Sequence, residues 1–191
     1  MSAILEWTAV ALGLVYLLGA VQQWRWCWIA GGISAGLFLI VFHEADLPIQ
    51  ALLQAYYMAV AVHGWWHWGA ADPGSTGLSV QQWPITWHLV AIAVVALLVV
   101  ATVALRGSAI ELSPTLDAAT GWGSALATWL VARKVLENWL YWIVIDSAAV
   151  VLYLHNGLGA TAALYALYTL IALLGWLKWR QTLSSAQPPS R

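Results

Sequence analysis

The chain is poor in charge and in cysteine, and both shortages exclude classes of function. Only 8% of its 191 residues are Asp, Glu, Lys or Arg. The single cysteine, Cys27, forbids an internal disulfide and leaves no Cys-x-x-Cys pair for redox or zinc chemistry. The sequence also has no basic patch for nucleic acid and no Gly-x-x-x-x-Gly-Lys-Ser/Thr loop for ATP hydrolysis. We therefore expect no cofactor, no metal site and no nucleic-acid partner.

What the chain has instead is a series of long apolar runs. Hydrophobic residues make up 62% of it, and the mean hydropathy is +0.78. A run of roughly 20 apolar residues crosses a hydrocarbon layer of about 30 Å as a helix. Seven runs approach or reach that length: Ile4–Val21, Trp26–Phe42, Leu47–Trp66, Thr86–Leu105, Leu116–Ala132, Asn138–Leu154 and Leu158–Leu177. The sequence thus predicts an all-α integral membrane protein with seven transmembrane helices and no soluble catalytic domain.

The few basic residues predict how the chain is oriented. Arg106 lies alone on one side of a seven-span chain. The other six Lys and Arg residues lie on the opposite side: Arg25, Arg133, Lys134, Lys178, Arg180 and Arg191. Because basic residues accumulate in cytoplasmic loops, the larger group should face the cytoplasm. We expect a multi-pass protein of the cell (inner or plasma) membrane, with its N-terminus outside and its C-terminus cytoplasmic.

Tryptophan is abundant, with 15 residues, and most of them lie near the ends of the apolar runs. An indole at such a place is expected to anchor in the membrane interface. This interpretation covers Trp7, Trp24, Trp26, Trp28, Trp65, Trp66, Trp68, Trp83, Trp87, Trp176 and Trp179.

Part of the third run recurs in the seventh. The residues Tyr57, Gly64, Trp65 and Trp68 reappear 111 positions later, the repeat offset of this chain, as Tyr168, Gly175, Trp176 and Trp179. Four crossings separate the two runs, so both cross the membrane in the same direction. The pattern predicts a parallel 3+1+3 arrangement of the SWEET type, with the site between the repeats. Its parts are a first repeat (1–68), a linker helix with flanking loops (69–115), a second repeat (116–180) and a disordered cytoplasmic tail (181–191).

Polar residues interrupt the sixth run. Asn138, Trp142 and Asp146 are four residues apart and therefore share one face of a helix. A carboxylate in an apolar helix costs about 2.5–3.5 kcal/mol on insertion, so Asp146 indicates a functional site. An amide, an aromatic ring and a negative charge suit a small, flat, cationic ligand. The structural alternative is that Asp146 pairs with Arg133 or Lys134.

The residues around this site resemble a known family. The segment 132–146 (Ala-Arg-Lys-Val-Leu-Glu-Asn-Trp-Leu-Tyr-Trp-Ile-Val-Ile-Asp) strongly resembles the PnuC nicotinamide riboside transporters, as do the stretch 152–180 and the paired tryptophans of 64–68. The resemblance implies a SWEET-like bundle, often a homotrimer, in which nicotinamide riboside diffuses down its gradient to serve NAD synthesis. Related carriers of thiamine and riboflavin share the scaffold, so the vitamin stays open.

The resemblance also implies roles for residues of the sixth run. The amide of Asn138 would read the carboxamide of the substrate, and the indole of Trp142 would stack on its ring. Nicotinamide riboside carries a pyridinium cation, which an aromatic face attracts by roughly 0.5–2 kcal/mol. Asp146 would add a Coulombic attraction to the same cation.

Five further residues are expected at or near the substrate. Lys134, Glu137 and Trp139 belong to the same motif and would shape the cytoplasmic rim or the pocket wall. Gln54 and Tyr57 would face the site from the first repeat. The structural alternatives are an interfacial charge pair for Lys134 and Glu137, and hydrogen bonds between helices for Gln54 and Tyr57.

Two other classes of protein stay open beside the carrier, although we expect no enzyme. A membrane-embedded enzyme would use Asp146 and Glu137 as acid and base, and would need a second polar cluster at the same depth. A structural subunit would use its tryptophans for packing, and would leave Asp146 without a purpose. His63 and His67 have the spacing of metal ligands but no acidic or cysteine partner, which favours an interfacial pair.

Overall fold

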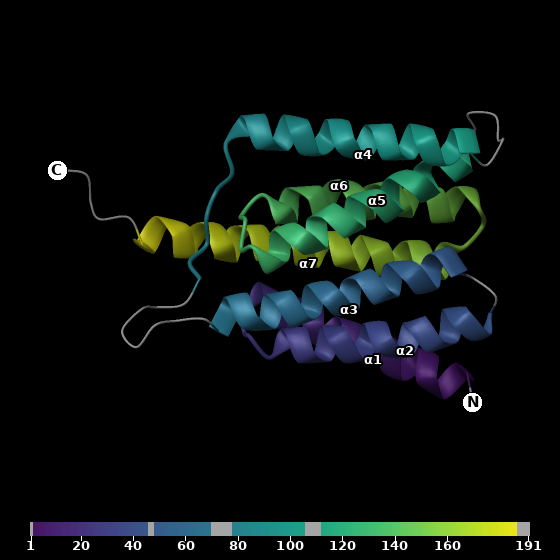
Figure 1. The fold of residues 1–191 in the computed structure, drawn as a ribbon, viewed down its shortest axis with the longest axis horizontal. Helices are drawn as coiled ribbons and strands as arrows, with labels where there is room; N and C mark the ends of the chain where they lie inside the picture. The colour runs from purple at the N-terminus through teal and green to yellow at the C-terminus, as the bar shows by residue number, and fades with distance from the viewer. Residues whose placement is uncertain (1, 46–47, 70–77, 106–111, 187–191) are drawn as a thin grey trace.

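Seven long helices that alternate in direction make up most of the described structure (Figure 1). The computed structural model describes residues 2–45, 48–69, 78–105 and 112–186. Its helices are α1 (Ser2–Val21), α2 (Cys27–Glu44), α3 (Pro48–Gly69), α4 (Ile85–Leu105), α5 (Leu112–Ala132), α6 (Asn138–His155) and α7 (Gly159–Ala186). Each predicted apolar run falls on one of these helices. The tail predicted to be disordered, 181–191, is helical over 181–186 because α7 continues to Ala186, and 187–191 lie outside the described residues.

The composition of the helices fits a membrane. Within the described residues, four segments are long and apolar enough to cross a bilayer: Ile4–Val21, Cys27–Glu44, Ile85–Leu105 and Thr161–Ser185. The helices α3, α5 and α6 carry more polar residues, and several of these, including Thr128, Asn138 and Asp146, are buried inside the protein. Buried polar groups and an apolar exterior are what a lipid environment requires. The chain is therefore an all-helical, multi-pass membrane protein.

The helix α4 lies at the edge of the molecule, against α5 and away from α1 and α2 (Figure 1). Its mean hydropathy of 2.8 is the highest of the four spans. Leu89, Val90, Leu97 and Val100 are each more than half exposed. A helix that is apolar all round and exposed along its length is suited to contact with lipid.

The ends of the helices recur at the repeat offset. Four pairs of ends fit it: Val21 and Ala132, Cys27 and Asn138, Glu44 and His155, and Pro48 and Gly159. Gln23 and Lys134 are related by the same offset, and they have positive φ angles of 60° and 49°, which non-glycine residues rarely adopt. The turn before α2 and the turn before α6 thus have the same backbone conformation.

Two tryptophans pack directly on glycines in these matching places. Trp28 of α2 covers Gly64 of α3, and Trp139 of α6 covers Gly175 of α7. A methyl group on either glycine would overlap the indole ring. Small residues let helix backbones approach closely in a membrane, where there is no hydrophobic force between helices. The two contacts hold α2 against α3 and α6 against α7.

Two further tryptophans tie the two groups of helices together. The Trp68 indole N–H of α3 donates to the Ala132 carbonyl oxygen of α5 at 3.1 Å. The Trp179 indole N–H of α7 donates to the Ala20 carbonyl oxygen of α1, also at 3.1 Å. Both carbonyls lie in the last turn of a helix, where no intrahelical partner exists, and that of Ala20 also accepts from the Gln23 backbone N–H at 3.0 Å. The groups α1–α3 and α5–α7 are therefore linked reciprocally.

The interfacial interpretation was wrong for three tryptophans. Trp28, Trp68 and Trp179 are 2%, 6% and 0% exposed, and they form edge-to-face or tilted ring contacts in the core. The ring centres of Trp28 and Trp68 lie 5.3 Å apart, with 87° between the ring planes. Those of Trp139 and Trp179 lie 5.4 Å apart, with 88° between the planes. These side chains are buried because they pack against a glycine or another tryptophan on a neighbouring helix. Their position near a helix end does not reveal that partner.

The glycine contacts give a test of this packing. Gly64→Ala and Gly175→Ala should each destabilise the purified protein by about 1–3 kcal/mol, because the added methyl group has no room beneath the indole. Gly121→Ala in α5 is the matched control, since a methyl group there meets nothing within 4 Å. Thermal unfolding in detergent measures all three. Equal midpoints for Gly64→Ala, Gly175→Ala and Gly121→Ala would contradict the packing.

Candidate functional site

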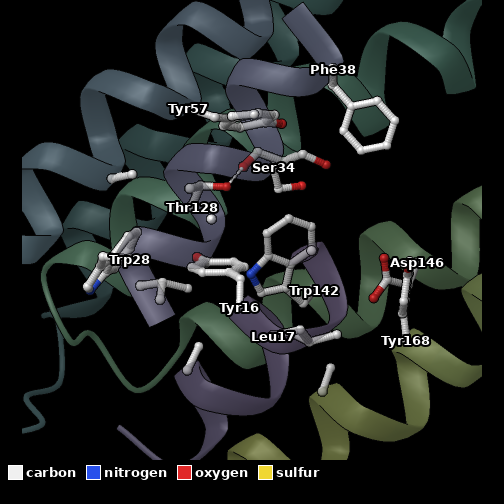
Figure 2. Close-up of a pocket in the computed structure, with 18 of the residues that line it drawn as sticks. Tyr16, Leu17, Trp28, Ser34, Phe38, Tyr57, Thr128, Trp142, Asp146 and Tyr168 are labelled. Carbon is white, nitrogen blue, oxygen red and sulfur yellow. Dashed lines mark hydrogen bonds between the residues drawn. The ribbon is translucent and has the colours of Figure 1, made fainter. Parts of the chain in front are cut away.

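A cavity of about 310 Å³ lies between the two groups of helices, and Figure 2 shows it in close-up. Residues from α1, α2 and α3 form one part of its wall, and residues from α5, α6 and α7 form the other. Among the described residues, α4 contributes none. Its volume is within the range of about 300–1,000 Å³ that is usual for small-molecule sites.

The wall of the cavity follows the same repeat offset. Apart from Tyr16, Ser34 and Phe38, every lining position has a lining counterpart at that offset in the other group of helices. The pairs that carry polar or aromatic groups include Trp28 and Trp139, Gly31 and Trp142, Ala35 and Asp146, Gln54 and Tyr165, and Tyr57 and Tyr168. The cavity thus has equivalent positions on its two sides, but the chemistry at several of them differs.

Asp146 supplies the only carboxylate on the described wall of this cavity. It is 4% exposed and lies beside Tyr168, as Figure 2 shows. Within the described residues it forms no ion pair, so neither Arg133 nor Lys134 neutralises it. A buried carboxylate without a cationic partner is costly, and such residues usually mark the path of a substrate or an ion. The cavity therefore offers a place for a positive charge.

Four other residues that the sequence indicated also line the cavity. Trp142 and Trp139 come from α6, and Gln54 and Tyr57 come from α3. Trp139 is fully buried, and its indole N–H has no partner within the described residues. The structure therefore places five of the eight expected residues, Asp146 included, on one cavity.

Asn138 does not line the cavity. It is fully buried at the first position of α6, where its side-chain N–H donates to the Val135 carbonyl oxygen at 2.6 Å. Its side-chain oxygen is buried without a hydrogen-bond partner in the described structure. The amide thus closes the turn before α6 and keeps one free acceptor.

Glu137 and Lys134 also lie outside the cavity wall, in the turn between α5 and α6. A Glu137 carboxylate oxygen accepts from the Trp83 backbone N–H at 3.3 Å and lies 3.8 Å from His88 Nε2. The Lys134 ammonium lies 4.8 Å from the centre of the Trp68 ring. Burial lowers the pKa of Lys134. The two charges therefore have separate partners and do not form the interfacial pair that was the structural alternative.

The turn between α5 and α6 is held by residues that the sequence analysis did not single out. Backbone hydrogen bonds join Gln81 to Lys134 and Leu136, at 3.0 and 2.8 Å. His88 Nδ1 lies 2.9 Å from the Tyr141 hydroxyl. His88 could have been found from the sequence, because it is the one histidine in the most apolar run. A histidine in a membrane helix indicates a polar partner. The linker helix is thus attached to α6.

The matching turn between α1 and α2 is held differently. Gln22 is hydrogen-bonded to the Lys178 ammonium, and the Gln23 amide donates to the Thr182 hydroxyl at 3.2 Å. Both partners belong to α7. One turn is therefore fixed by α4 and the segment before it, and the other by the end of α7.

Three tyrosines of the cavity were also missed as site residues: Tyr16, Tyr165 and Tyr168. Tyr168 had been noticed only as a member of the repeat. The repeat offset, applied to Gln54, would have identified Tyr165. Tyr16 is the one tyrosine of the first run, but the repeat does not mark it, because its counterpart at the repeat offset is Ala127.

Comparison with known proteins places this geometry in a family. Residues 3–181 match the family model described as nicotinamide mononucleotide transporter. The riboflavin/roseoflavin transporter RibM of Streptomyces davaonensis is 30% identical over 159 residues, which cover 81% of this chain and 74% of that protein. The nicotinamide riboside transporter PnuC of Escherichia coli K12 is 28% identical over 163 residues, which cover 71% of this chain and 67% of that protein.

A solved structure has the same fold. The crystal structure of the vitamin B3 transporter PnuC superposes with a TM-score of 0.72 over 97% of this chain and 84% of that chain, at 19% sequence identity. The resemblance seen in segment 132–146 is thereby confirmed by the family model, by relatives and by the fold. The chain belongs to the nicotinamide mononucleotide transporter family, which includes the PnuC vitamin transporters.

Proposed function

We propose that this protein carries nicotinamide riboside across the cell membrane by facilitated diffusion, for use in NAD synthesis. The observation that carries the proposal is a cavity between two groups of helices with a carboxylate, Asp146, and an indole, Trp142, on its wall. The solute is a flat pyridinium cation. The carboxylate attracts its charge, and aromatic faces attract it by about 0.5–2 kcal/mol each.

The polar groups of the cavity suit the rest of the solute. Its ribose hydroxyls and carboxamide need hydrogen-bond partners when they leave water. Gln54 and Tyr57 provide them from α3, and Thr128 from α5. The indole N–H groups of Trp28 and Trp139 are buried without partners within the described residues, and they are further donors.

The three expected residues outside the cavity act, in this proposal, at its cytoplasmic end. Asn138 lies one turn before Trp142 on α6 and keeps a free acceptor. Because Asn138 does not line the cavity, the proposal has it contact the solute's carboxamide only after the solute has left the cavity toward the cytoplasm. Lys134 and Glu137 form the rim there.

The architecture that we propose is the SWEET-like 3+1+3 bundle. Residues 1–68 form the first repeat, 116–180 the second, and 69–115 the linker helix with its loops. The helix ends, the tryptophan–glycine contacts and the paired cavity positions all share the repeat offset, and they support parallel repeats. A transport site between two such repeats is the usual arrangement in these carriers. A homotrimer is part of the same proposal, supported by the family resemblance.

Two other solutes and one other activity are the alternatives. The similarity to RibM supports riboflavin as the solute. Riboflavin is neutral, however, and would leave the charge of Asp146 without a partner. Thiamine also has a cationic ring and is the closer competitor in charge. For an enzyme, the acid and base would be Asp146 and Glu137, but only Asp146 is on the cavity wall. The family neighbours are transporters, so we propose a carrier.

Orientation is tested by cysteine labelling. In a Cys27→Ala background, Glu44→Cys should react with an impermeant maleimide on intact cells, and Arg180→Cys only after permeabilisation. The basic ends of the helices support this orientation, and both test positions are exposed. The reverse pattern of labelling would contradict an external N-terminus.

Energy coupling is tested in liposomes. With potassium and valinomycin clamping the voltage at zero, nicotinamide riboside should equilibrate without ATP, sodium or a proton gradient. An inside-negative potential should drive accumulation, because each 100 mV is worth about 2.3 kcal/mol for a cation. Accumulation against the gradient at zero voltage, driven by sodium or protons, would exclude facilitated diffusion.

The cavity residues are tested by binding. Trp142→Ala should lower the affinity for nicotinamide riboside roughly ten- to hundredfold, as the loss of an aromatic stacking partner does in other proteins. Asp146→Asn should lower the affinity for this cation about tenfold and leave the affinity for neutral riboflavin unchanged, because the substitution removes only the charge. The exposed Glu44→Gln serves as the control that removes a charge outside the cavity. If Asp146→Asn binds the cation as wild type does, the charge has no role in recognition.

A further inference from the structure

Tyr16 breaks the pairing of the cavity wall. It lines the cavity from α1, but its counterpart at the repeat offset is Ala127, which is fully buried and does not line it. The opposite exchange occurs nearby, because the counterpart of Trp142 on α6 is Gly31 on α2. The first group of helices therefore presents Tyr16, and also Phe38, where the second has a buried alanine, and the second presents Trp142 where the first has Gly31.

Gly31 fixes the place of the Tyr16 ring. A methyl group on Gly31 would come within 2.8 Å of Tyr16 Cδ2 and 3.1 Å of Tyr16 Cγ, so the ring lies directly on the glycine. On another side the Tyr16 ring contacts the Trp28 ring, at 5.4 Å between centres. This is its one ring contact among the described residues, and Trp142 is not its partner. The ring is thus held in place without being stacked on Trp142.

The Tyr16 hydroxyl is buried and has no hydrogen-bond partner within the described part of the chain. A buried hydroxyl without a partner costs free energy, which a ligand recovers by bonding to it. Figure 2 shows Tyr16 and Trp142 together in the cavity, with Asp146 beyond the indole. The ring of Tyr16 therefore lies on the cavity wall, and its buried hydroxyl keeps unused bonding capacity.

We propose that Tyr16 and Trp142 are the two aromatic plates between which the ring of the solute stacks, and that the Tyr16 hydroxyl bonds to a polar group of that solute. Gly31 has no side chain because the Tyr16 plate occupies that space. This inference rests on the proposed function, in which the cavity holds a flat vitamin. It makes Tyr16 and Gly31 determinants of specificity: they set how thick a ring system the cavity accepts.

The test measures nicotinamide riboside binding to purified variants by calorimetry. Tyr16→Ala should weaken binding about ten- to hundredfold, since it removes a plate. Tyr16→Phe should weaken it severalfold, because it removes only the hydroxyl. Gly31→Ala should weaken it at least tenfold by displacing the Tyr16 ring into the cavity. The matched control is Gly36→Ala on the same helix, where a methyl group meets only Met58 at an ordinary 3.8 Å and binding should change less than twofold.

A second variant separates binding from folding. If Gly31→Ala lowers the thermal midpoint, Gly31→Ala with Tyr16→Ala should restore it, because the overlap is gone, and should bind as weakly as Tyr16→Ala. A folded Tyr16→Ala protein with wild-type affinity would overturn the two-plate inference. Wild-type protein that binds riboflavin and not nicotinamide riboside would contradict the proposed substrate instead. The same variants then test the plates with riboflavin as the probe.

Discussion

The rest of this structure depends on one kind of contact, the packing of a tryptophan ring directly on a glycine. It occurs once in each group of helices. Trp28 on Gly64 and Trp139 on Gly175 bring neighbouring helices close together in lipid, where apolar surface alone gives no reason to associate. The same two indoles form part of the cavity wall. Helix packing and the cavity wall therefore use the same side chains, so a change that loosens the helices also alters the cavity.

On this repeated framework, the chemistry lies where the two halves of the cavity wall differ. Asp146 corresponds to Ala35, and Trp142 corresponds to Gly31, so charge and one aromatic ring come from the second half. Tyr16 supplies a ring from the first half. The equivalent positions line both sides of the cavity, and the differing ones place a carboxylate on one side only. The contacts of Gln81 and Glu137 attach α4 and the segment before it to the turn between α5 and α6.

The helices could be predicted from sequence because each apolar run is long, and the repeat because tryptophan and glycine mark the same places twice. The residues Trp142, Asp146, Gln54 and Tyr57 could be grouped since polar groups in apolar helices have few other reasons to be there. Asn138 could not be placed, because the helical drift over two turns and the tight turn before α6 direct it away from the cavity wall. The position of the Tyr16 ring depends on a glycine in another helix, which no local pattern reveals.

An experimental structure of the protein with nicotinamide riboside bound would test the central claim most directly, namely that the cavity between the two groups of helices is the solute path. The account predicts density for the pyridinium ring inside this cavity, against Trp142 and with Asp146 as its nearest carboxylate. Density for the solute anywhere outside the cavity, with the cavity empty, would contradict it.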